Sequence, residues 1–199
     1  MSDAFFDVVN RQRSCRSFRS DPVADDLIER MLSAATHAPS AENRQPWEFI
    51  VIRDTGTRHR VGELMLHAWT NGAQQWSEGR LTASLLDDVD VGMRGGVANA
   101  PVLIAACVDL DRTMEVTTGS SMFPAIQNLL LAATALGLGT ALTTIATAFE
   151  QQLRALLALP ETVRVVAIIP LGWPERTLGP PRRNPFATHT HRETYGTAW

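Results

Sequence analysis

Two nearly continuous apolar stretches set the strongest constraint on how this chain can fold. They are residues 101–108, which read PVLIAACV, and residues 163–171, which read VRVVAIIPL. A short apolar run of this kind is typical of a β-strand that is buried on both faces. The run FIVI at 49–52 is a third candidate strand, rich in β-branched and aromatic residues. The sequence therefore predicts a central sheet in the core of the molecule.

Segments with helical spacing lie between these predicted strands. Residues 25–36 place their apolar side chains along one face, as an amphipathic helix does. Residues 121–137 are apolar around most of the helix, so this helix belongs at the centre of the fold or at a subunit interface. The remaining predicted elements are helices at 3–12, with Asp3 as a cap, and at 148–157, and a β-prone run at 140–145. Helices and strands interleave, so the class is α/β or α+β, and the strand order stays open.

The length of the chain and the lack of internal repeats predict one domain over residues 1–199. Residues 56–95 contain helical pieces and are expected to form an excursion that covers a pocket. Trp69 and Trp76 in this region serve either as pocket walls or as core packing, and both interpretations stay open. A flexible link is expected at the glycines that close the region, Gly92, Gly95 and Gly96. Residues 175–199 form an irregular, basic C-terminal extension that is expected to lie over another part of the structure.

Charge and residue content argue against several classes of function. A net charge of −3 and a pI near 5.9 argue against a nucleic-acid-binding protein, which would carry a basic stripe. Basic residues are instead clustered at 11–19 and 176–192, which suits a small anionic ligand. Neither of the two cysteines, Cys15 and Cys107, has the spacing of a metal ligand or of a disulfide framework. The histidines fit neither a catalytic triad nor a ligand set, and no partner base for a catalytic Cys15 is evident.

No segment of the sequence predicts targeting to, or insertion into, a membrane. The beginning of the chain lacks the pattern of a signal peptide, because Asp3, Asp7 and several arginines interrupt it. The chain also lacks an apolar run of about 20 residues, the length that a membrane-spanning helix needs. We therefore expect a soluble, cytoplasmic protein that has neither nucleic acid nor a membrane as a partner.

Two polar stretches carry the signals for ligand binding. Residues 12–18, QRSCRSF, place two arginines and a small hydroxyl close together, and the planar guanidinium suits phosphate. The alternative for this stretch is a solvated basic turn. Residues 38–47, APSAENRQPW, form a loop stiffened by two prolines, which suits the presentation of backbone donors to a ligand. The alternative here is an ordinary connection between a helix and a strand.

Three stretches, taken together and in order, resemble the nitroreductase family of flavin enzymes. They are QRSCRSF with the following Asp21-Pro22-Val23, then APSAENRQPW, and then the glycine-containing run at 137–144 followed by 159–174. The resemblance implies an α+β sandwich with a central, mostly antiparallel sheet flanked by helices, in a domain-swapped type of homodimer. It also implies one FMN in each of two sites at the dimer interface. NADH or NADPH would reduce this cofactor before a second substrate reoxidises it in a ping-pong cycle.

The family's binding positions can be carried over to this sequence one at a time. Gln12 stands where the N-terminal FMN-binding segment commonly has arginine, so this chain departs from the pattern there. Arg13 and Ser14 would serve the phosphate and ribityl end, and Cys15 belongs to the same segment. Arg16 would approach the N1/O2 edge of the ring, where reduction places negative charge that a fixed cation stabilises.

The remaining binding positions come from two loops and the C-terminal extension. Pro39, Ser40 and Asn43 match a loop that lies along the flavin from the partner subunit. The backbone N–H groups of a segment near N5 and O4 match Leu142, Thr143 and Thr144. Arg183 matches a C-terminal basic residue that clamps the phosphate. Neither a metal nor a certain catalytic side chain is predicted, because FMN carries the chemistry.

The resemblance leaves several reactions open. The first is hydride transfer from NADH or NADPH through FMN to a nitro, quinone-like or other conjugated acceptor. The second keeps the fold but fragments the flavin or removes a halogen reductively, and residues 56–95 would decide between them. The third is a non-catalytic flavin-binding module, for which the departure at Gln12 leaves room.

Overall fold

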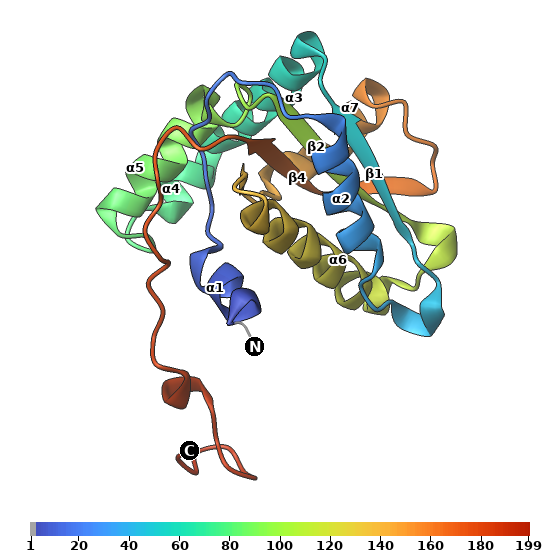
Figure 1. The fold of residues 1–199 in the computed structure, drawn as a ribbon. Helices are drawn as coiled ribbons and strands as arrows, with labels where there is room; N and C mark the ends of the chain where they lie inside the picture. The colour runs from blue at the N-terminus through green and yellow to red at the C-terminus, as the bar shows by residue number, and fades with distance from the viewer. Residues whose placement is uncertain (1–2) are drawn as a thin grey trace.

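The computed structural model, which describes residues 3–199, contains one antiparallel sheet with helices on both sides (Figure 1). Within the described residues the order of its four strands is β1-β2-β4-β3, and every neighbouring pair is antiparallel. The strands are β1 (Trp47–Ile52), β2 (Val102–Asp109), β3 (Gly139–Thr140) and β4 (Val163–Gly172). The fold class is therefore α+β with an antiparallel sheet, as the resemblance implied.

The apolar run of β2 is explained by the two separate cores that it joins. Side chains alternate along a strand, and those of Val102, Ile104 and Ala106 enter the core on one face. The intervening Leu103 and Ala105 enter the core on the other face. All five side chains are fully buried. A strand with apolar partners on both faces has no position for a polar residue, which confirms the prediction made for this stretch.

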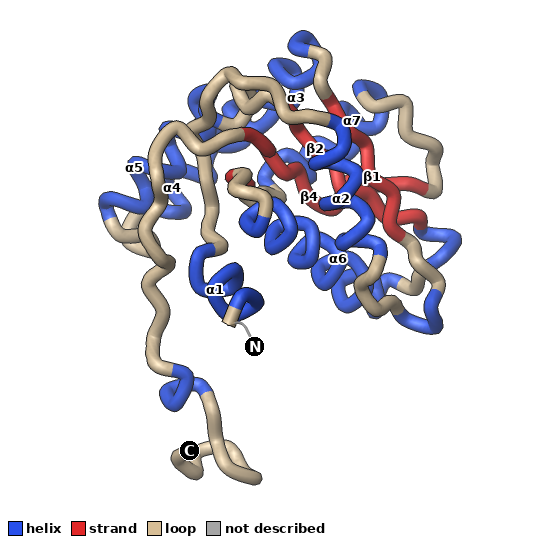
Figure 2. Tube along the Cα trace, viewed as in Figure 1, coloured by secondary structure: helices blue, strands red, loops and turns tan. Residues whose placement is uncertain are grey.

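The helices divide between the two faces of the sheet (Figures 1 and 2). Their bounds are α1 (Ala4–Arg11), α2 (Asp25–Thr36), α3 (Thr55–Ala68), α4 (Gln74–Ser77), α5 (Ala83–Val91), α6 (Glu115–Ala135) and α7 (Glu150–Leu156). On the first face, α2 and α6 contribute buried side chains such as Met31 and Leu129. On the second face, α3 and α7 contribute Val61 and Leu153. Short 3-10 helices occur at Ala41–Asn43, Leu110–Arg112, Ile145–Phe149 and Phe186–His189, and π-helical turns occur at Trp69–Ala73 and Gly92–Gly96.

The central helix is longer than its apolar pattern indicated. It begins at Glu115 rather than at residue 121, because its first turns carry a single apolar side chain, Val116, and so show no apolar pattern. It retains Pro124 in its interior and ends at Ala135. Gly137 follows with a φ of 79°, the left-handed conformation that commonly terminates a helix and that glycine adopts at low cost.

Three smaller predictions hold only in part. Asp3 is the N-cap residue of α1, as predicted, but its side chain accepts no capping hydrogen bond. The β-prone run at 140–145 pairs only as far as Thr140, apart from an isolated bridge at Thr143, because Ile145 starts a 3-10 helix. The helix predicted at 148–157 is α7, which begins at Glu150 and not at residue 148. These differences lie at element ends, where neighbouring structure outweighs intrinsic propensity.

Residues 56–95 form a packed helical layer that α3, α4 and α5 build together. Trp69 is buried in the second core, and its Nε1 donates to Asp90 Oδ1 at 2.8 Å, so it acts in packing. Trp76 is 65% exposed and stacks against the Arg80 guanidinium. Of the glycines at the end of this region, Gly92 is buried within a π-helical turn, and both Gly92 and Gly96 lie close to Arg16. Among the described residues, no helix is long and apolar enough to cross a membrane.

Ile104→Ala is expected to lower the free energy of unfolding by about 2–5 kcal/mol, since the fully buried side chain would leave a cavity in the first core. Denaturant-induced unfolding measures this change. The matched control is Val51→Ala on β1, where the side chain is 36% exposed and the expected loss is below about 1 kcal/mol. Similar losses in both variants would contradict the placement of β2 at the centre of the sheet.

Candidate functional site

The basic N-terminal segment lies beside the end of the sheet. The backbone N–H of Cys15 donates to the carbonyl oxygen of Thr140 at 2.8 Å, and Ser14 forms a parallel bridge with Thr140. Two stretches that are more than a hundred residues apart in sequence thus meet at β3. This contact places Arg13, Ser14 and Arg16 close to the segment that continues through Thr143 and Thr144.

The 142–144 segment is fixed on the sheet by its middle residue. Thr143 N donates to the carbonyl oxygen of Ile168 at 3.0 Å, and Ile168 N donates back to Thr143 O at 2.8 Å. This reciprocal pair leaves Thr143 half-buried, whereas Leu142 and Thr144 on either side are exposed. The backbone of the segment is therefore rigid at a position where its flanking residues face outward.

Arg13 connects the N-terminal segment to the C-terminal extension. Its Nη1 donates to the carbonyl oxygen of Gly179 at 3.0 Å, which uses one of the five N–H donors of the guanidinium. Gln12 is half-buried at the end of α1, and its backbone N–H donates to Val8 O at 2.9 Å. Arg183 lies further along the extension, exposed, and its Nη1 donates to Arg182 O at 2.9 Å. A phosphate clamp between Arg13 and Arg183 stays a prediction.

Arg16 forms an ion pair that could not be predicted from the sequence. Its Nη1 lies 2.6 Å from Asp88 Oδ2 on α5, and the two side chains are 16% and 29% exposed. Arg176 Nη2 lies 3.8 Å from the other oxygen of Asp88. Since 72 residues separate Arg16 from Asp88, no local pattern connects them, and only the packing of α5 against the N-terminal segment brings them together.

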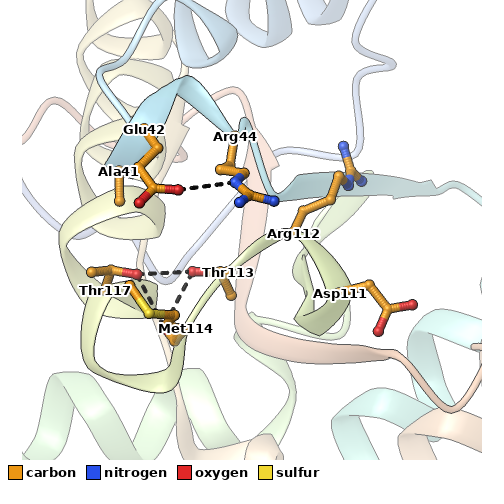
Figure 3. A pocket seen from close by; sticks show the side chains of 8 residues that line it. All are labelled: Ala41, Glu42, Arg44, Asp111, Arg112, Thr113, Met114 and Thr117. Atoms are coloured by element: carbon orange, nitrogen blue, oxygen red, sulfur yellow. Dashed lines mark hydrogen bonds and ion pairs between the residues drawn. The ribbon is translucent and has the colours of Figure 1, made fainter.

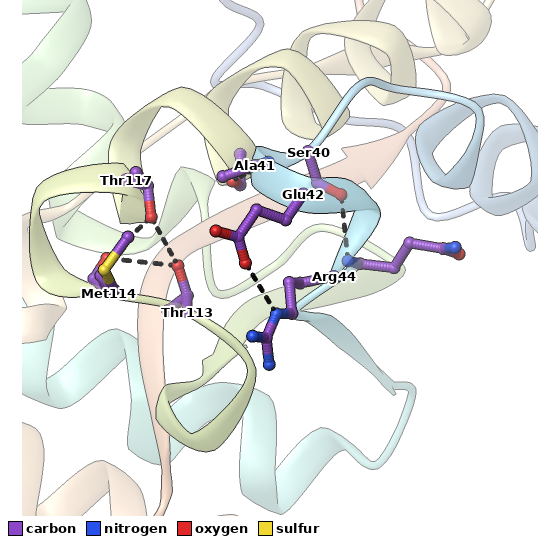
Figure 4. A network of polar contacts seen from close by, with 9 residues as sticks. Ser40, Ala41, Glu42, Arg44, Thr113, Met114 and Thr117 are labelled. Atoms are coloured by element: carbon purple, nitrogen blue, oxygen red, sulfur yellow. Dashed lines mark hydrogen bonds and ion pairs between the residues drawn. The ribbon is translucent and has the colours of Figure 1, made fainter.

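The loop at 38–46 is held in a strained conformation by its own polar groups (Figure 4). Ser40 Oγ accepts a hydrogen bond from the backbone N–H of Gln45 at 3.0 Å, and Asn43 Oδ1 accepts one from Gln45 Nε2 at 3.2 Å. Glu42, Asn43 and Gln45 adopt φ values of 53°, 54° and 49°, which side-chain-bearing residues seldom do. Pro39 precedes them and is exposed. Strain of this kind is typical of functional loops.

A cavity of about 240 Å³ opens beside this loop (Figure 3). It is lined by Ala41, Glu42, Arg44, Asp111, Arg112, Thr113, Met114 and Thr117. Arg112 is held at its edge by Asp109, whose Oδ2 accepts from Nε at 2.7 Å, and by contact with Glu48. The hydrogen bond from Arg112 lowers the pKa of Asp109, so this carboxylate stays ionised at neutral pH.

A second and larger cavity of about 630 Å³ begins at Thr144. It lies between the end of α3 and the 3-10 helix Ile145–Phe149, and its walls include His67, Asn71 and Phe149. The rings of His67 and Phe149 meet edge to face with their centroids 5.5 Å apart. His67 was not a candidate site residue from the sequence, because the elements that form this cavity come together only in the folded chain.

Within one chain, the two groups of predicted binding residues lie at opposite ends of α6 (Figure 1). The loop at 38–46 is joined to α6 by Ala41 N, which donates to Ser121 Oγ at 3.1 Å. The basic segment meets Thr140, just beyond the C-terminal end of α6 at Ala135. A helix rises about 1.5 Å per residue, so Ser121 and Ala135 are separated by roughly 21 Å. One chain therefore does not bring Ser40 and Asn43 to Arg13 and Arg16.

Comparison with known proteins shows which family this chain belongs to. The model of the nitroreductase family matches residues 9–173, which include the basic segment, the strained loop and the segment after β3. This chain belongs to the nitroreductase family. A crystal structure of a nitroreductase with bound FMN from Desulfitobacterium hafniense has the same fold, with a TM-score of 0.76 and 24% identity over 97% of this chain and all of that one.

Relatives within the nitroreductase family differ in their named activities. A protein of Archaeoglobus fulgidus with the provisional name NADH dehydrogenase/NAD(P)H nitroreductase is 30% identical over 84% of both chains. The 5,6-dimethylbenzimidazole synthase of Rhodospirillum rubrum is 29% identical over 82% of this chain and 78% of its own. Iodotyrosine deiodinase 1 of Rattus norvegicus is 26% identical over 88% of this chain and 64% of its own. Membership of the nitroreductase family thus indicates an oxidoreductase but does not identify the substrate that accepts the electrons.

The cysteines of this nitroreductase-family chain are placed for packing. Burial raises the pKa of the Cys15 thiol, and its Sγ donates to Ser17 O at 3.3 Å. Burial in the second core raises the pKa of Cys107 to about 12. Thiolate, the reactive form, is therefore scarce at neutral pH. Among residues 3–199, no group of three or more His, Cys, Asp or Glu side chains is placed to hold a metal ion.

Both thiols are expected to react with a disulfide reagent at pH 8 at least about a hundredfold more slowly in the native protein than in denaturant. The reason is that burial excludes the reagent and raises both pKa values. The absorbance of the released thiolate, recorded with and without denaturant, measures the two rates. A native thiol that reacts as fast as the unfolded chain would contradict the burial of that cysteine.

Proposed function

We propose that this protein binds FMN and transfers hydride from NADH or NADPH through it to a nitro, quinone-like or other conjugated acceptor. The supporting observation is the contact between Cys15 and Thr140, which brings the cations of the basic segment beside the segment at 142–144. The bound FMN of the nitroreductase from Desulfitobacterium hafniense adds support, because the two chains share their fold.

The donors of this site suit the groups that FMN presents. Arg13 has a guanidinium with donors beyond the one used by Gly179, and Ser14 adds a hydroxyl, so this pair would hold the phosphate and ribityl end. Arg16 would lie at the N1/O2 edge of the ring. The backbone of 142–144, rigid through Thr143, would lie at N5 and O4. When bound, FMN supplies the ring that accepts and donates hydride, while these residues bind and orient it.

We further propose that the working form is a homodimer in which each site uses two chains. The supporting observation is the separation of the strained loop from the basic segment, because a second copy would bring Pro39, Ser40 and Asn43 to the first copy's arginines. The C-terminal extension first lies against the basic segment, through Gly179, and its last part then stands away from the sheet and helices (Figure 2). Its large apolar side chains Phe186 and Tyr195 are 65% and 94% exposed, as expected of residues that contact a partner chain. Arg183 would then reach the phosphate from this extension.

The purified protein is expected to be a yellow dimer that contains FMN and loses its flavin absorbance when NADH or NADPH is added without oxygen. Addition of a nitro or quinone acceptor should restore the absorbance. Spectra before and after each addition, together with size-exclusion chromatography, measure these results. A colourless protein that takes up no FMN would refute the proposal, and tight FMN binding without reduction would favour a non-catalytic flavin-binding module.

The named activities of two relatives support a second candidate function on the same fold. The relatives are the 5,6-dimethylbenzimidazole synthase and iodotyrosine deiodinase 1, and both match more than four fifths of this chain. Reduced protein given oxygen, or given a halogenated phenol, would test flavin fragmentation and reductive dehalogenation respectively. A product in either assay, with no turnover of nitro or quinone compounds, would replace the leading proposal.

Mixing two variants with weakened FMN binding tests whether each site uses two chains. Arg13→Glu alters the basic segment, and Ser40→Trp blocks the strained loop, so each homodimer is expected to bind FMN at least about tenfold more weakly. In an exchanged one-to-one mixture, half of the dimers are mixed, and each mixed dimer carries one intact and one doubly altered site. About a quarter of all sites should therefore regain FMN binding. No recovery after exchange would show that each site is built from one chain.

A further inference from the structure

One face of the α5 region is shaped to receive Arg16. Asp88 and Gly92 are four residues apart, so they lie on the same side of the helix. A Cβ atom added at Gly92 would lie 2.8 Å from Arg16 Cδ, and one added at Gly96 would overlap the Arg16 carbonyl oxygen. Only glycine permits this approach, so the backbone and stem of Arg16 rest directly on the helix. This placement of the Arg16 backbone and stem sets its guanidinium beside Asp88.

Asp88 is the carboxylate that faces this guanidinium. Its Oδ2 lies 2.6 Å from Arg16 Nη1, and both side chains are mostly shielded from water, at 29% and 16% exposure. Its Oδ1 is 3.8 Å from Arg176, whose side chain is 74% exposed and whose charge is therefore screened by water. The neighbouring carboxylate Asp90 is directed elsewhere, because it accepts from Trp69 Nε1 and Arg94 Nε.

We propose that Asp88 is a positioning residue that fixes the direction of Arg16 and offsets part of its positive charge. This inference rests on the proposed function, in which Arg16 lies at the N1/O2 edge of FMN. A cation at that edge favours the reduced ring, on which negative charge gathers. A carboxylate beside the cation weakens this preference, and more so where water is largely excluded. Asp88 thus makes bound FMN easier to reoxidise, which favours delivery of electrons to the acceptor over their retention.

Asp88→Asn tests this role in the FMN-loaded protein. The amide oxygen can still accept from Arg16, so the variant removes the charge while keeping the volume and a hydrogen-bond acceptor. The affinity for reduced relative to oxidised FMN is expected to rise about tenfold, which corresponds to a reduction potential about 30 mV more positive for a two-electron couple. Equilibration with a redox dye measures this potential, and Asp88→Glu, which restores the charge, is expected to return it towards the parent value.

Asp87→Asn is the matched control. It removes the same charge one residue earlier, at an exposed position of α5, and the potential is expected to stay unchanged. If Asp88→Asn leaves the potential unchanged or makes it more negative, the charge-offsetting role of Asp88 is overturned. An equal shift of the potential in Asp87→Asn would overturn this role as well, because the effect would then not depend on contact with Arg16.

The FMN-free protein provides a separate readout of the ion pair. Thermal unfolding of Arg16→Gln, Asp88→Asn and the double variant should be non-additive, since each single variant already removes the attraction between the two charges. Additive changes in Tm would overturn the pairing itself. A parent protein that binds no FMN refutes the proposed function and with it the role of Asp88. A parent that binds FMN with no change of potential in Asp88→Asn refutes the role of Asp88 alone.

Discussion

The burial of β2 on both faces is the constraint on which the rest of this structure depends. Its side chains alternate between two cores, so the sheet needs a helical layer on each side. The first layer contains α6, which the strained loop contacts at Ser121, and the basic segment pairs with Thr140 beyond its C-terminal end. The second layer contains α5, which brings Asp88 to Arg16. The candidate site residues therefore depend on both helical layers that cover this sheet.

The candidate site combines charged side chains with a fixed backbone segment, and no reactive side chain was predicted for it. Both cysteines are buried with raised pKa values, and residues 3–199 contain no cluster suited to a metal ion. In contrast, the N-terminal segment presents arginines next to a backbone segment that Thr143 and Ile168 hold rigid. Such an arrangement suits an oxidoreductase whose chemistry is supplied by a cofactor, as membership of the nitroreductase family implies.

The two predicted halves of the site lie far apart in one chain, which suggests a second reason for the apolar character of α6. The sequence left this helix either at the centre of the fold or at a subunit interface. Its buried side chains, such as Ile126 and Leu129, belong to the first core, whereas Phe123 is 43% exposed. A helix with both kinds of side chain can serve the core of its own chain and present a surface to a second copy. The proposed dimer uses this surface and the exposed C-terminal extension together.

Local pattern in the sequence determined the strands β2 and β4, the helix α2 and the basic segment, because strand burial, helical amphipathicity and a run of arginines are all written in neighbouring residues. Motif order determined the family as well. Only the tertiary structure decided that Trp69 packs in the core, that Gly92 lies against the Arg16 side chain, and that Asp88 pairs with Arg16. These features depend on residues far apart in the chain, and their distances are set by how the two helical layers pack on the sheet.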